Sequence, residues 1–263
     1  MAMNRVIVIT GGTSGIGLDL KNLFVNNGDT VLTISTRKLD DSNHYSCSVA
    51  DEINIKQTID KIGKNFGRID ILINNAGFGM SGICELLPTE QIKNLIDVNY
   101  MGTIYTIQSA IKYMERGSKI INISSAMALF PVPFRGIYAS AKSAVLTLSF
   151  ALKMELQSLG IDVTAICPGD VKTNFTKNRI KQFDTNPRYG KRLQNATEKS
   201  DNREDKRMSS ISCATKVFKI ICHKKLKPFY IIGTKYKLLY FATRFTPKSM
   251  LLNITNKLYG GNK

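Results

Sequence analysis

Short apolar runs alternate with helix-like segments through the first two thirds of the chain. The apolar runs are rich in β-branched side chains, as expected for strands buried on both faces; they lie at 5–10, 30–35, 45–49, 69–74, 118–124 and 161–167. Segments with apolar residues at helical spacing lie between them, at 15–28, 54–67, 89–114 and 137–160. This alternation with short links predicts an α/β fold of Rossmann type, a doubly wound parallel sheet with helices on both faces.

The pattern changes after Pro168-Gly169. Residues 172–207 are polar, basic and poor in aliphatic side chains, and we expect a loop or loosely packed helices there. Further elements follow, an amphipathic helix over 209–224, a last strand over 228–233 and terminal helices over 237–245 and 249–260. We therefore predict a single domain over 1–263 with about seven strands. In this domain, 172–207 acts as a lid over a ligand cleft and 208–263 completes the fold.

Charge follows the same division of the chain. Residues 1–171 hold 15 Lys/Arg and 15 Asp/Glu, whereas residues 172–263 hold 22 Lys/Arg and 5 Asp/Glu, so the whole net charge of +17 lies in the C-terminal third. Such a segment attracts nucleic acid, anionic lipid or an acidic substrate, or is a solvated lysine-rich surface. No helix-turn-helix, zinc-finger or stacked-aromatic pattern accompanies the charge, so we expect no nucleic-acid partner.

The remaining composition indicates an ordinary globular protein. Its cysteines are odd in number and form no CxxC pair, so we expect reduced thiols and neither a disulfide framework nor a metal site; they are Cys47, Cys84, Cys167, Cys213 and Cys222. The first apolar run is too short for a signal peptide, and no stretch of about 20 apolar residues exists to span a membrane. We expect a cytoplasmic protein.

The stretch TGGTSGIG (10–17) stands where the first predicted strand leads into the first predicted helix. Gly11, Gly15 and Gly17 allow a tight turn and let a pyrophosphate approach the backbone, while the helix N-terminus offers free N–H groups and a partial positive charge. Ordinary tight turns also use glycine. The strand–turn–helix context is what favours a dinucleotide-binding site.

The end of the second predicted strand indicates which dinucleotide is preferred. An acidic residue there would bind both ribose hydroxyls and repel a 2′-phosphate. The strand instead ends in Ser35 and Thr36, and two cations follow, Arg37 and Lys38. This favours NADP(H) over NAD(H), although Arg37 and Lys38 are also compatible with plain exposed loop charges.

The stretch YASAK (138–142) places Tyr138 and Lys142 on one face of the predicted helix 137–160. A free phenol has a pKa of about 10, too high for acid–base work near neutral pH, and a nearby ammonium lowers it. The small residues between them leave room for a cofactor along the helix. Taken alone, the pair is also typical of an exposed Tyr and Lys on the surface of an amphipathic helix.

Further polar stretches follow the ends of predicted strands. They are NNAG (74–77), ISS (123–125) and CPGDVKT (167–173), and VNYMGT (98–103) places an Asn inside a helix. Ligands bind at strand C-termini in such sheets. In this order and spacing, with TGGTSGIG and YASAK, the motifs closely resemble the short-chain dehydrogenase/reductase family. The resemblance is strong from residue 5 to about residue 175 and looser beyond.

The resemblance implies a catalytic tetrad of Asn99, Ser125, Tyr138 and Lys142. Tyr138 would give a proton to a carbonyl oxygen in reduction or take one from an alcohol in oxidation, and Ser125 would orient the same oxygen. Lys142 would bind the nicotinamide ribose and lower the pKa of the phenol. Asn99 would distort its helix and hold a water that links Lys142 to solvent. The protein supplies alignment and the proton, and hydride moves between nicotinamide and substrate.

The cofactor contacts expected from the glycine turn, the second strand and the resemblance come from several segments. They are Gly11, Thr13, Ser14, Gly15, Ile16, Gly17, Thr36, Arg37, Lys38, Ser48, Val49, Asn75, Ala76, Gly77, Tyr138, Lys142, Pro168, Gly169, Val171 and Thr173. Two departures from the family concern the adenosine end. The pair Ser48-Val49 replaces an Asp-Val pair that contacts adenine, which leaves backbone groups of Val49 for that contact. The link from Arg37 to Ser48 is also too short for the usual helix.

Large apolar residues follow the tetrad strands and are candidates for the substrate pocket, with core packing as the alternative for each: Phe78, Met80, Met127, Leu129, Phe130, Val132, Phe134 and Phe175. Met and Phe suit bulky, oily ligands. We expect a hydrophobic alcohol or ketone such as a steroid, a bile acid or a fatty-acyl derivative. One alternative is a reductase of small ketones or aldehydes. The other is a non-catalytic NADP-sensing or nucleic-acid-binding protein on the same fold.

Partners beyond the substrate are suggested by two features. The basic, apolar C-terminal third suits an anionic substrate or an acidic membrane surface, and the sequence does not choose between them. The predicted helices 89–114 and 137–160 are apolar on more than one face. The family commonly pairs these two helices across an interface, which implies a homodimer or homotetramer.

Overall fold

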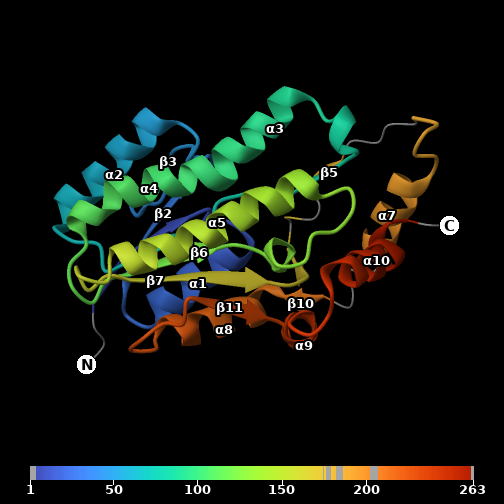
Figure 1. Ribbon diagram of the computed structural model, residues 1–263. Coiled ribbons are helices and arrows are strands. Elements are labelled where there is room, and N and C mark those ends of the chain that lie inside the picture. The colour runs from blue at the N-terminus through green and yellow to red at the C-terminus, as the bar shows by residue number, and fades with distance from the viewer. Residues whose placement is uncertain (1–3, 174, 176–178, 182–185, 202–206, 262–263) are drawn as a thin grey trace.

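The central sheet of the protein has seven parallel strands (Figure 1). The computed structural model describes residues 4–173, 175, 179–181, 186–201 and 207–261. The strand order is β11-β7-β6-β4-β1-β2-β3, which is the doubly wound arrangement that the sequence predicts. The strands are β1 (Val6–Thr10), β2 (Thr30–Ser35), β3 (His44–Ser46), β4 (Ile71–Asn74), β6 (Lys119–Ile123), β7 (Asp162–Pro168) and β11 (Phe229–Ile232).

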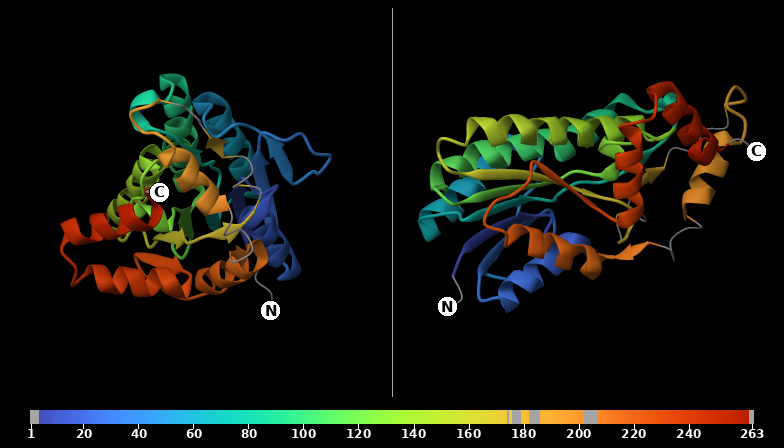
Figure 2. Two further views of the ribbon diagram at one scale, coloured as in Figure 1. Left: turned by 90° about the vertical axis from the view of Figure 1, so that its right-hand side faces the viewer. Right: turned by 60° about the horizontal axis from the view of Figure 1, so that its bottom comes forward.

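Alternation along the strands divides the interior into two apolar layers. Val6 and Val8 of β1 face one layer, and Ile7 and Ile9 face the other. The first layer is covered by α2 (Glu52–Phe66), α4 (Gly102–Ala110) and α5 (Gly136–Glu155), and the second by α1 (Gly15–Asn26) and α8 (Ser210–Ile221). Figure 2 shows these helices on the two sides of the sheet. Because both faces are covered, the strands read as continuous apolar runs.

The helix predicted over 89–114 is not continuous. It consists of α3 (Thr89–Ile96), a π-helical turn at Asp97–Met101, α4 and a 3-10 turn at Ile111–Tyr113. Helical periodicity continues through all four pieces, which is why the apolar pattern alone does not separate them. The predicted short link after β2 is confirmed, since residues 36–43 contain no helix.

The segment 172–207 contains more regular structure than its polar composition indicates. β8 (Val171–Lys172) pairs with β10 (Met208–Ser209), and β9 (Ile180–Lys181) pairs with β5 (Met80–Ser81). Helix α7 (Arg192–Asp201) packs against α10 (Lys248–Tyr259), which follows α9 (Thr234–Thr243). Residues 174, 176–178, 182–185 and 202–206 of the predicted lid lie outside the described residues.

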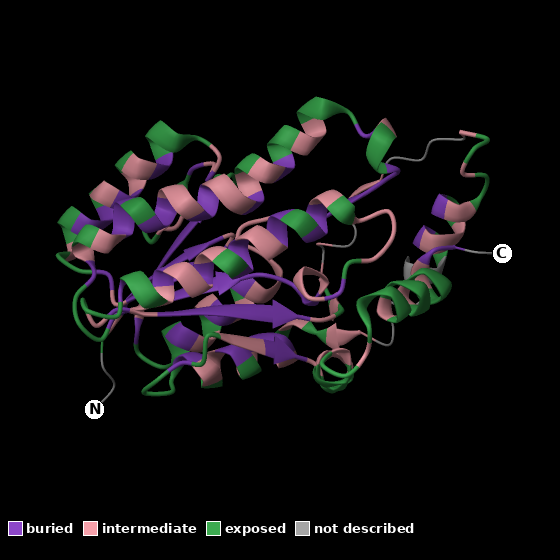
Figure 3. Cartoon of the chain, in the orientation of Figure 1, coloured by how far each residue is buried: buried purple, intermediate pink, exposed green. Residues whose placement is uncertain are grey.

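Burial differs strongly between the sheet and the C-terminal helices (Figure 3). The sheet and the inner faces of its helices are buried, whereas α9 and α10 are largely exposed. All five cysteines are free thiols, and Cys47, Cys167 and Cys213 are buried. In the part of the chain that the structure describes, no helix combines the length and the apolar character needed to cross a bilayer.

Candidate active site

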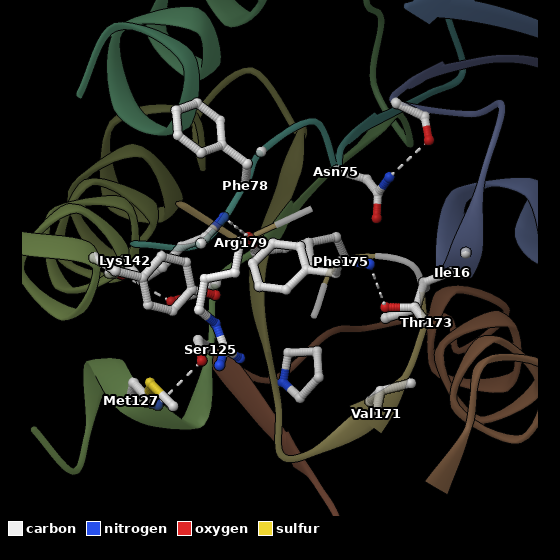
Figure 4. A pocket seen from close by; sticks show the side chains of 18 of the residues that line it. Ile16, Asn75, Phe78, Ser125, Met127, Lys142, Val171, Thr173, Phe175 and Arg179 are labelled. Atoms are coloured by element: carbon white, nitrogen blue, oxygen red, sulfur yellow. Dashed lines mark hydrogen bonds between the residues drawn. The ribbon is translucent and has the colours of Figure 1, made fainter. Parts of the chain in front are cut away.

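A cavity of about 250 Å³ opens where β1, β4, β6 and β7 end (Figure 4). Its location agrees with the rule that ligands of parallel sheets bind at the carboxyl ends of strands. Predicted cofactor and catalytic residues from all these segments line it: Gly11, Ser14, Gly15, Ile16, Asn75, Ala76, Gly77, Ser125, Tyr138, Lys142, Pro168, Gly169, Val171 and Thr173. The structure therefore brings these predicted residues together around one cavity.

Glycine is required at two positions of the turn between β1 and α1. Gly11 has a φ of 67°, in the left-handed region that favours glycine, and a Cβ there would lie 3.0 Å from the Cα of Ala76. A Cβ on Gly17 would collide with the carbonyl oxygen of Gly11. The bare backbone and the N-terminus of α1 thus form a cradle of N–H groups that suits a pyrophosphate.

The NNAG stretch after β4 holds this turn in place. The Asn75 side-chain amide donates to the carbonyl oxygens of Thr10 and Gly11, at 3.1 Å each. The Thr10 hydroxyl accepts from the backbone N–H groups of Asn75 and Ala76, at 3.0 and 3.1 Å. Thr10 is a positioning residue that the sequence analysis missed, although its place at the end of the first strand signals it.

Arg37 lies beside the glycine turn rather than pointing away from it. Its guanidinium donates to the carbonyl oxygen of Thr13 at 3.1 Å, and its backbone N–H donates to the Ser35 hydroxyl at 3.3 Å. Arg37 and Lys38 are both exposed. A cation at the end of β2 beside this turn suits a 2′-phosphate on the adenosine ribose.

Ser48 and Val49, the predicted adenosine contacts, are not among the described residues that line the cavity. The Val49 side chain is buried in the core, where a Cβ on Gly102 would come within 2.9 Å of its Cβ. The Ser48 hydroxyl accepts from the backbone N–H of Ala50 at 3.3 Å. Both side chains therefore have structural contacts within the protein, and the backbone of Val49 is what remains for an adenine.

Asn99 accounts for the π-helical turn between α3 and α4. It is fully buried, its amide donates to the carbonyl oxygen of Phe78 and its Oδ1 accepts from the Phe78 N–H, both at 2.9 Å. A side chain tied to another segment in this way pulls the helix out of α geometry. A Cβ on Gly77 would lie 2.7 Å from the same Oδ1 and 3.4 Å from the Lys142 ammonium nitrogen, so both groups border this glycine. The predicted helix distortion at Asn99 is present.

Ser125 follows β6 and caps the 3-10 turn Ala126–Ala128. Its hydroxyl accepts from the backbone N–H of Met127 at 3.1 Å, as drawn in Figure 4. Ser125 also acts on Tyr138, because it lowers the pKa of the phenol. The neighbouring Ser124 donates to the carbonyl oxygen of Lys142 at 2.7 Å, which ties the end of β6 to the first turns of α5.

Tyr138 and Lys142 are buried on one face of α5, and burial dominates their protonation. Burial raises the pKa of Tyr138, while the hydrogen bond with Ser125 and the charges of Arg179 and Arg135 lower it. Burial also lowers the pKa of Lys142 to about 8, and its ammonium donates to the carbonyl oxygen of Ile123 at 2.9 Å. Ser125 and the two arginines therefore lower the pKa of the phenol, and the effect expected of Lys142 stays a prediction.

The predicted apolar pocket residues divide into three groups. Phe78, Met80, Met127 and Phe175 line the main cavity, and the rings of Phe175 and Tyr138 lie 5.8 Å apart. Phe130, Val132 and Phe134 line a smaller cavity of about 70 Å³ that also contains Met127. Leu129 packs into the core beside β7, so for this residue the packing alternative holds.

Two sets of polar residues near the site were missed by the sequence analysis. Arg135, Arg179 and Arg207 line the main cavity, and no local motif singles them out. A buried chain of hydrogen bonds also runs from Thr106 through Asn74 and Asn122 to Ser149, at 2.6, 2.9 and 2.9 Å. It fixes α4 and α5 to β4 and β6 beneath the cavity.

Comparison with known proteins agrees with this geometry. A family model for short chain dehydrogenases matches residues 5–184. A 3-ketodihydrosphingosine reductase from Bacteroides thetaiotaomicron is 34% identical over 180 residues, which cover 66% of this chain and 67% of the relative. A probable short-chain type dehydrogenase/reductase from Helicobacter pylori, VdlC, is 29% identical over 252 residues, 92% of this chain and 93% of the relative.

Solved structures share the same fold. A short-chain dehydrogenase from Streptomyces avermitilis superposes with a TM-score of 0.81 at 22% identity, with full coverage of both chains. The structure of ElxO with NADP bound gives a TM-score of 0.73 at 25% identity and covers 90% of this chain and 100% of that one. With the family model spanning well over half of the sequence, the chain belongs to the short-chain dehydrogenase/reductase family and is an NAD(P)-dependent oxidoreductase.

Proposed function

We propose that the protein uses NADP(H) to interconvert a carbonyl and a secondary alcohol on a hydrophobic substrate, such as a steroid, a bile acid or a fatty-acyl derivative. One observation carries the proposal. Ser125 and Tyr138 both line the cavity that the glycine turn also lines, with apolar walls beside them, and Ser125 lowers the pKa of the phenol. A proton donor, an orienting hydroxyl and a dinucleotide cradle thus share one cleft.

Each residue of the proposed tetrad has a distinct task. Bound nicotinamide supplies or accepts the hydride. Tyr138 holds the proton that the substrate oxygen gains or loses, and Ser125 hydrogen-bonds the same oxygen and fixes its position. Lys142 binds the ribose hydroxyls and, through its charge, stabilises the phenolate when the proton has left. Asn99 acts through the backbone of Phe78, which it holds beside Gly77 and Lys142.

Arg37 supports the choice of NADP(H). Its guanidinium is fixed at the glycine turn by Thr13, where a 2′-phosphate would meet it. The replacement of both Arg37 and Lys38 by Glu should lower kcat/KM for NADPH relative to NADH by about tenfold to a hundredfold, because charge-assisted hydrogen bonds to phosphate are lost. Lys64→Glu, an exposed lysine on α2, is the control and should leave the ratio unchanged. An unchanged ratio in the double variant would remove the preference for NADP(H).

The apolar walls support a hydrophobic substrate. Phe78, Met80, Met127 and Phe175 face the cavity, and polarizable Met and aromatic side chains suit bulky apolar ligands. The 3-ketodihydrosphingosine reductase to which the chain is similar carries a lipid ketone in its name, which favours the same class. We propose that the segment 172–207 acts as the lid of this site, since β8, β9 and β10 anchor it to the cleft and Phe175 and Arg179 line the cavity.

The proposed function is tested by nicotinamide absorbance with purified protein, NADPH or NADH, and ketones of four kinds: steroid, bile-acid, fatty-acyl and small. We expect NADPH to be consumed with one of the three bulky classes. Consumption with small ketones or aldehydes alone would favour the small-carbonyl reductase instead. A protein that binds NADPH, shown by nucleotide fluorescence, yet reduces none of the four kinds would overturn the substrate class.

We also propose that copies of the chain pair through the outer faces of α4 and α5. Tyr105 and Leu148 are partly buried apolar side chains on these helices, and Met154 at the end of α5 is 70% exposed. Light scattering should give at least twice the chain mass of 29.3 kDa, and Met154→Arg should lower it, whereas Ile53→Arg on α2 should not. A monomeric wild-type protein would rule out the pairing.

A further inference from the structure

Three arginines from separate segments meet at the cavity that holds Tyr138. Arg135 precedes α5, Arg179 precedes β9 and Arg207 precedes β10, and all three line the main cavity. Figure 4 shows the Arg179 side chain pointing into the cavity. Each arginine is partly buried. Three guanidinium groups that line one partly buried cleft offer several N–H donors to an anionic ligand.

The protonation of neighbouring groups shows that these charges act on one another. Burial, together with the charges of Arg179 and Arg207, lowers the pKa of Arg135 to about 10. Arg179 and Arg135 are also the cations that lower the pKa of Tyr138. The pair Arg135 and Arg179 therefore lies at the phenol end of the cavity, where the substrate reacts.

Four basic side chains line the described part of the cavity, Lys142 and the three arginines, together with the carboxylate of Asp170. One oxygen of Asp170 accepts a hydrogen bond from the Tyr236 hydroxyl at 2.7 Å, and its charge raises the pKa of Arg135. Several cationic side chains therefore border the end of the cleft at which Tyr138 lies.

The backbone before Arg135 is held in an unfavourable conformation. Phe134 has a φ of 63°, in the left-handed region that non-glycine residues rarely adopt. Its carbonyl oxygen accepts from the N–H of Gly82 at 2.9 Å, and the Arg192 guanidinium lies over its ring at 5.8 Å. These contacts hold the turn that presents Arg135 to the cavity. Strain of this kind is commonly retained at functional sites.

We propose that Arg135 and Arg179, with Arg207 beside them, bind an anionic group of the substrate, a carboxylate or a phosphate. Arginine is suited to this task because its planar guanidinium binds either group through two parallel hydrogen bonds. The inference rests on the function proposed above and narrows its substrate class to amphipathic anions, with the apolar body against Phe78, Met80, Met127 and Phe175. The phosphates of the cofactor are the other anions that these arginines could bind. The cradle of N–H groups that suits those phosphates lies at the glycine turn.

The test compares a keto acid with its own methyl ester, 5-oxodecanoate and methyl 5-oxodecanoate. Arg135→Met and Arg179→Met keep an apolar stem and remove the charge. Each should lower kcat/KM for the acid by about tenfold to a hundredfold, because a charge-assisted hydrogen bond is lost, and should change that of the ester less than about threefold. The dissociation constant of NADPH should stay the same. Arg188→Met, an exposed arginine of the same segment, is the control.

Three outcomes would overturn the proposal. In the first, the wild-type kcat/KM for the ester equals or exceeds that for the acid. In the second, the arginine variants lower kcat/KM for the acid and the ester equally. In the third, they weaken NADPH binding by the same factor as they lower kcat/KM for the acid. A calorimetric titration of decanoate into the NADP⁺ complex separates this proposal from the reaction itself. If decanoate binds to the wild type and not to Arg179→Met, the anion site is supported even when no ketone is reduced. If the ester is reduced but decanoate does not bind, the anion site is contradicted.

A second inference comes from the outer surface of α9 and α10, which together we call the C-terminal hairpin (residues 234–259). Figure 1 shows these helices at one end of the molecule. In α9 and the turn after it, Leu238, Phe241 and Phe245 are 66, 61 and 76% exposed and lie on one face at spacings of three and four residues. In α10 the exposed apolar side chains are Met250, Leu252, Ile254 and Leu258. An apolar surface of this extent marks an interaction site.

The opposite faces of the hairpin pack against the rest of the protein. The exposed apolar side chains therefore belong to helices that are anchored. The Tyr240 ring lies 6.5 Å from the Phe130 ring and 5.4 Å from the Phe229 ring. The Arg192 guanidinium of α7 donates to the side-chain oxygen of Asn256 at 3.3 Å. The exposed face is therefore presented by helices that are held on their other side.

Every ionised side chain of the hairpin is cationic. It carries Lys235, Lys237, Arg244, Lys248 and Lys257, and residues 206–263 contain no Asp or Glu. We propose that this hairpin docks on an anionic lipid surface, with its apolar side chains in the interface and its lysines at the lipid phosphates. A second copy of the chain is a poorer occupant, since pairing would bring two cationic faces together. The smaller cavity, lined by Tyr236 and Leu239 of the hairpin, shares Arg135 and Asp170 with the main one, so docking would bring the cleft close to the lipid.

The test is sedimentation of the full chain with vesicles of phosphatidylcholine, with and without an equal part of phosphatidylglycerol. We expect pelleting with the anionic vesicles at physiological salt and less at higher salt. The double variant Phe241→Asp, Phe245→Asp should lower the partition coefficient at least about tenfold, whereas Ile53→Asp, a 69% exposed apolar residue on α2, should not. Thermal unfolding checks that both variants fold.

Docking on lipid is overturned if the wild-type protein stays in the supernatant or if the double variant pellets like it. Light scattering on the same samples distinguishes the competing occupant. A mass that falls to that of one chain in the double variant, with no pelleting of the wild type, would assign the hairpin to contacts between copies of the chain.

Discussion

The first 171 residues and the remainder of the chain are built on different principles. In the first region the central strands are buried on both faces, charges balance at 15 of each sign, and most of the predicted catalytic and cofactor residues line the cleft. In the second region 22 basic residues meet 5 acidic ones, and α9 and α10 leave apolar side chains exposed. The family model covers the first region and ends at residue 184.

This contrast separates two tasks. The first region contains the glycine turn, Ser125 and Tyr138, which we propose as the cradle and the proton donor of a carbonyl–alcohol interconversion with a nicotinamide. The second supplies Arg179 and Arg207 to the cleft and an exposed basic hairpin next to it. We infer that the first region determines the reaction and the second determines which molecule reaches it. Substitutions in the two regions should therefore change different measurements.

The largest effect is expected at Tyr138, in the first region. Tyr138→Phe removes the proton donor but keeps the ring against Phe175, so kcat should fall by about a hundredfold to ten-thousandfold, the usual contribution of a positioned acid. NADPH binding should be almost unchanged, since no other contact is lost. The measurements are steady-state rates and a nucleotide fluorescence titration.

Tyr105→Phe is the matched control for Tyr138→Phe. It removes the same hydroxyl from a partly buried tyrosine of α4 that packs on the core outside the cavity. We expect activity within about twofold of wild type, as is usual for conservative changes away from such sites. A Tyr138→Phe protein that keeps most of its activity would show that the proton comes from elsewhere.

The next largest effect concerns the buried ammonium of Lys142 and depends on pH. Its pKa in the folded protein is about 8, below the usual lysine value of 10.5, so folding an ionised Lys142 costs free energy. The cost is fully present below pH 8, falls as pH rises from 8 toward 10.5 and is absent above. Lys142→Met should therefore raise the free energy of unfolding at pH 7, by up to about 3 kcal/mol, and the gain should shrink at pH 10.

Urea unfolding of the two proteins at pH 7 and pH 10, without nucleotide, measures this difference. Lys64→Met, an exposed lysine on α2, should change stability equally at both pH values. The lost hydrogen bond to Ile123 lowers the gain at both pH values and leaves the trend intact. A gain that does not depend on pH would mean that burial does not control the ammonium.

Much of this first region could be predicted from the sequence, for a physical reason. A strand buried on both faces gives a continuous apolar run, and a glycine that accepts no Cβ, such as Gly17, lies beside its strand in the sequence as well as in space. The tetrad was equally accessible because Ser125 ends a strand and Tyr138 and Lys142 share a helical face. The π-helical turn at Asn99 was predictable only as a distortion, since it depends on the remote backbone of Phe78.

The arginines were not predictable in the same way. Arg135, Arg179 and Arg207 lie 44 and 28 residues apart in the sequence and meet because β8, β9 and β10 bring their segments to the cleft. A polar, basic composition indicates a surface and not a binding site. The net charge of the C-terminal third did indicate an anionic partner, but it could not separate the charges that face the cleft from those that face solvent.

Two Gly→Ala substitutions, one in each region, compare the effect of the same added methyl group on NADPH binding. A Cβ on Gly17 would collide with the Gly11 carbonyl, so Gly17→Ala should weaken NADPH binding by about tenfold to a hundredfold, the usual cost of overpacking. Gly190 also has a φ in the left-handed region, 52°, but no heavy atom lies within 4 Å of its added Cβ. Gly190→Ala should leave the dissociation constant of NADPH unchanged. Equal weakening by both variants would contradict the proposed division of tasks.

The smallest effect is expected where the two regions meet. The Tyr236 hydroxyl of α9 donates to Asp170 at 2.7 Å, and a Cβ on Gly169 would collide with the Tyr236 ring. Tyr236→Phe keeps the ring and removes one hydrogen bond to a carboxylate, which is worth about 2 kcal/mol. Asp170 would then be less firmly held beside Arg135, whose pKa its charge raises. We expect KM for an anionic substrate to change severalfold while NADPH binding and kcat stay close to wild type, because the C-terminal region reaches the cleft at its substrate end. A change confined to NADPH binding would place this contact with the cofactor instead.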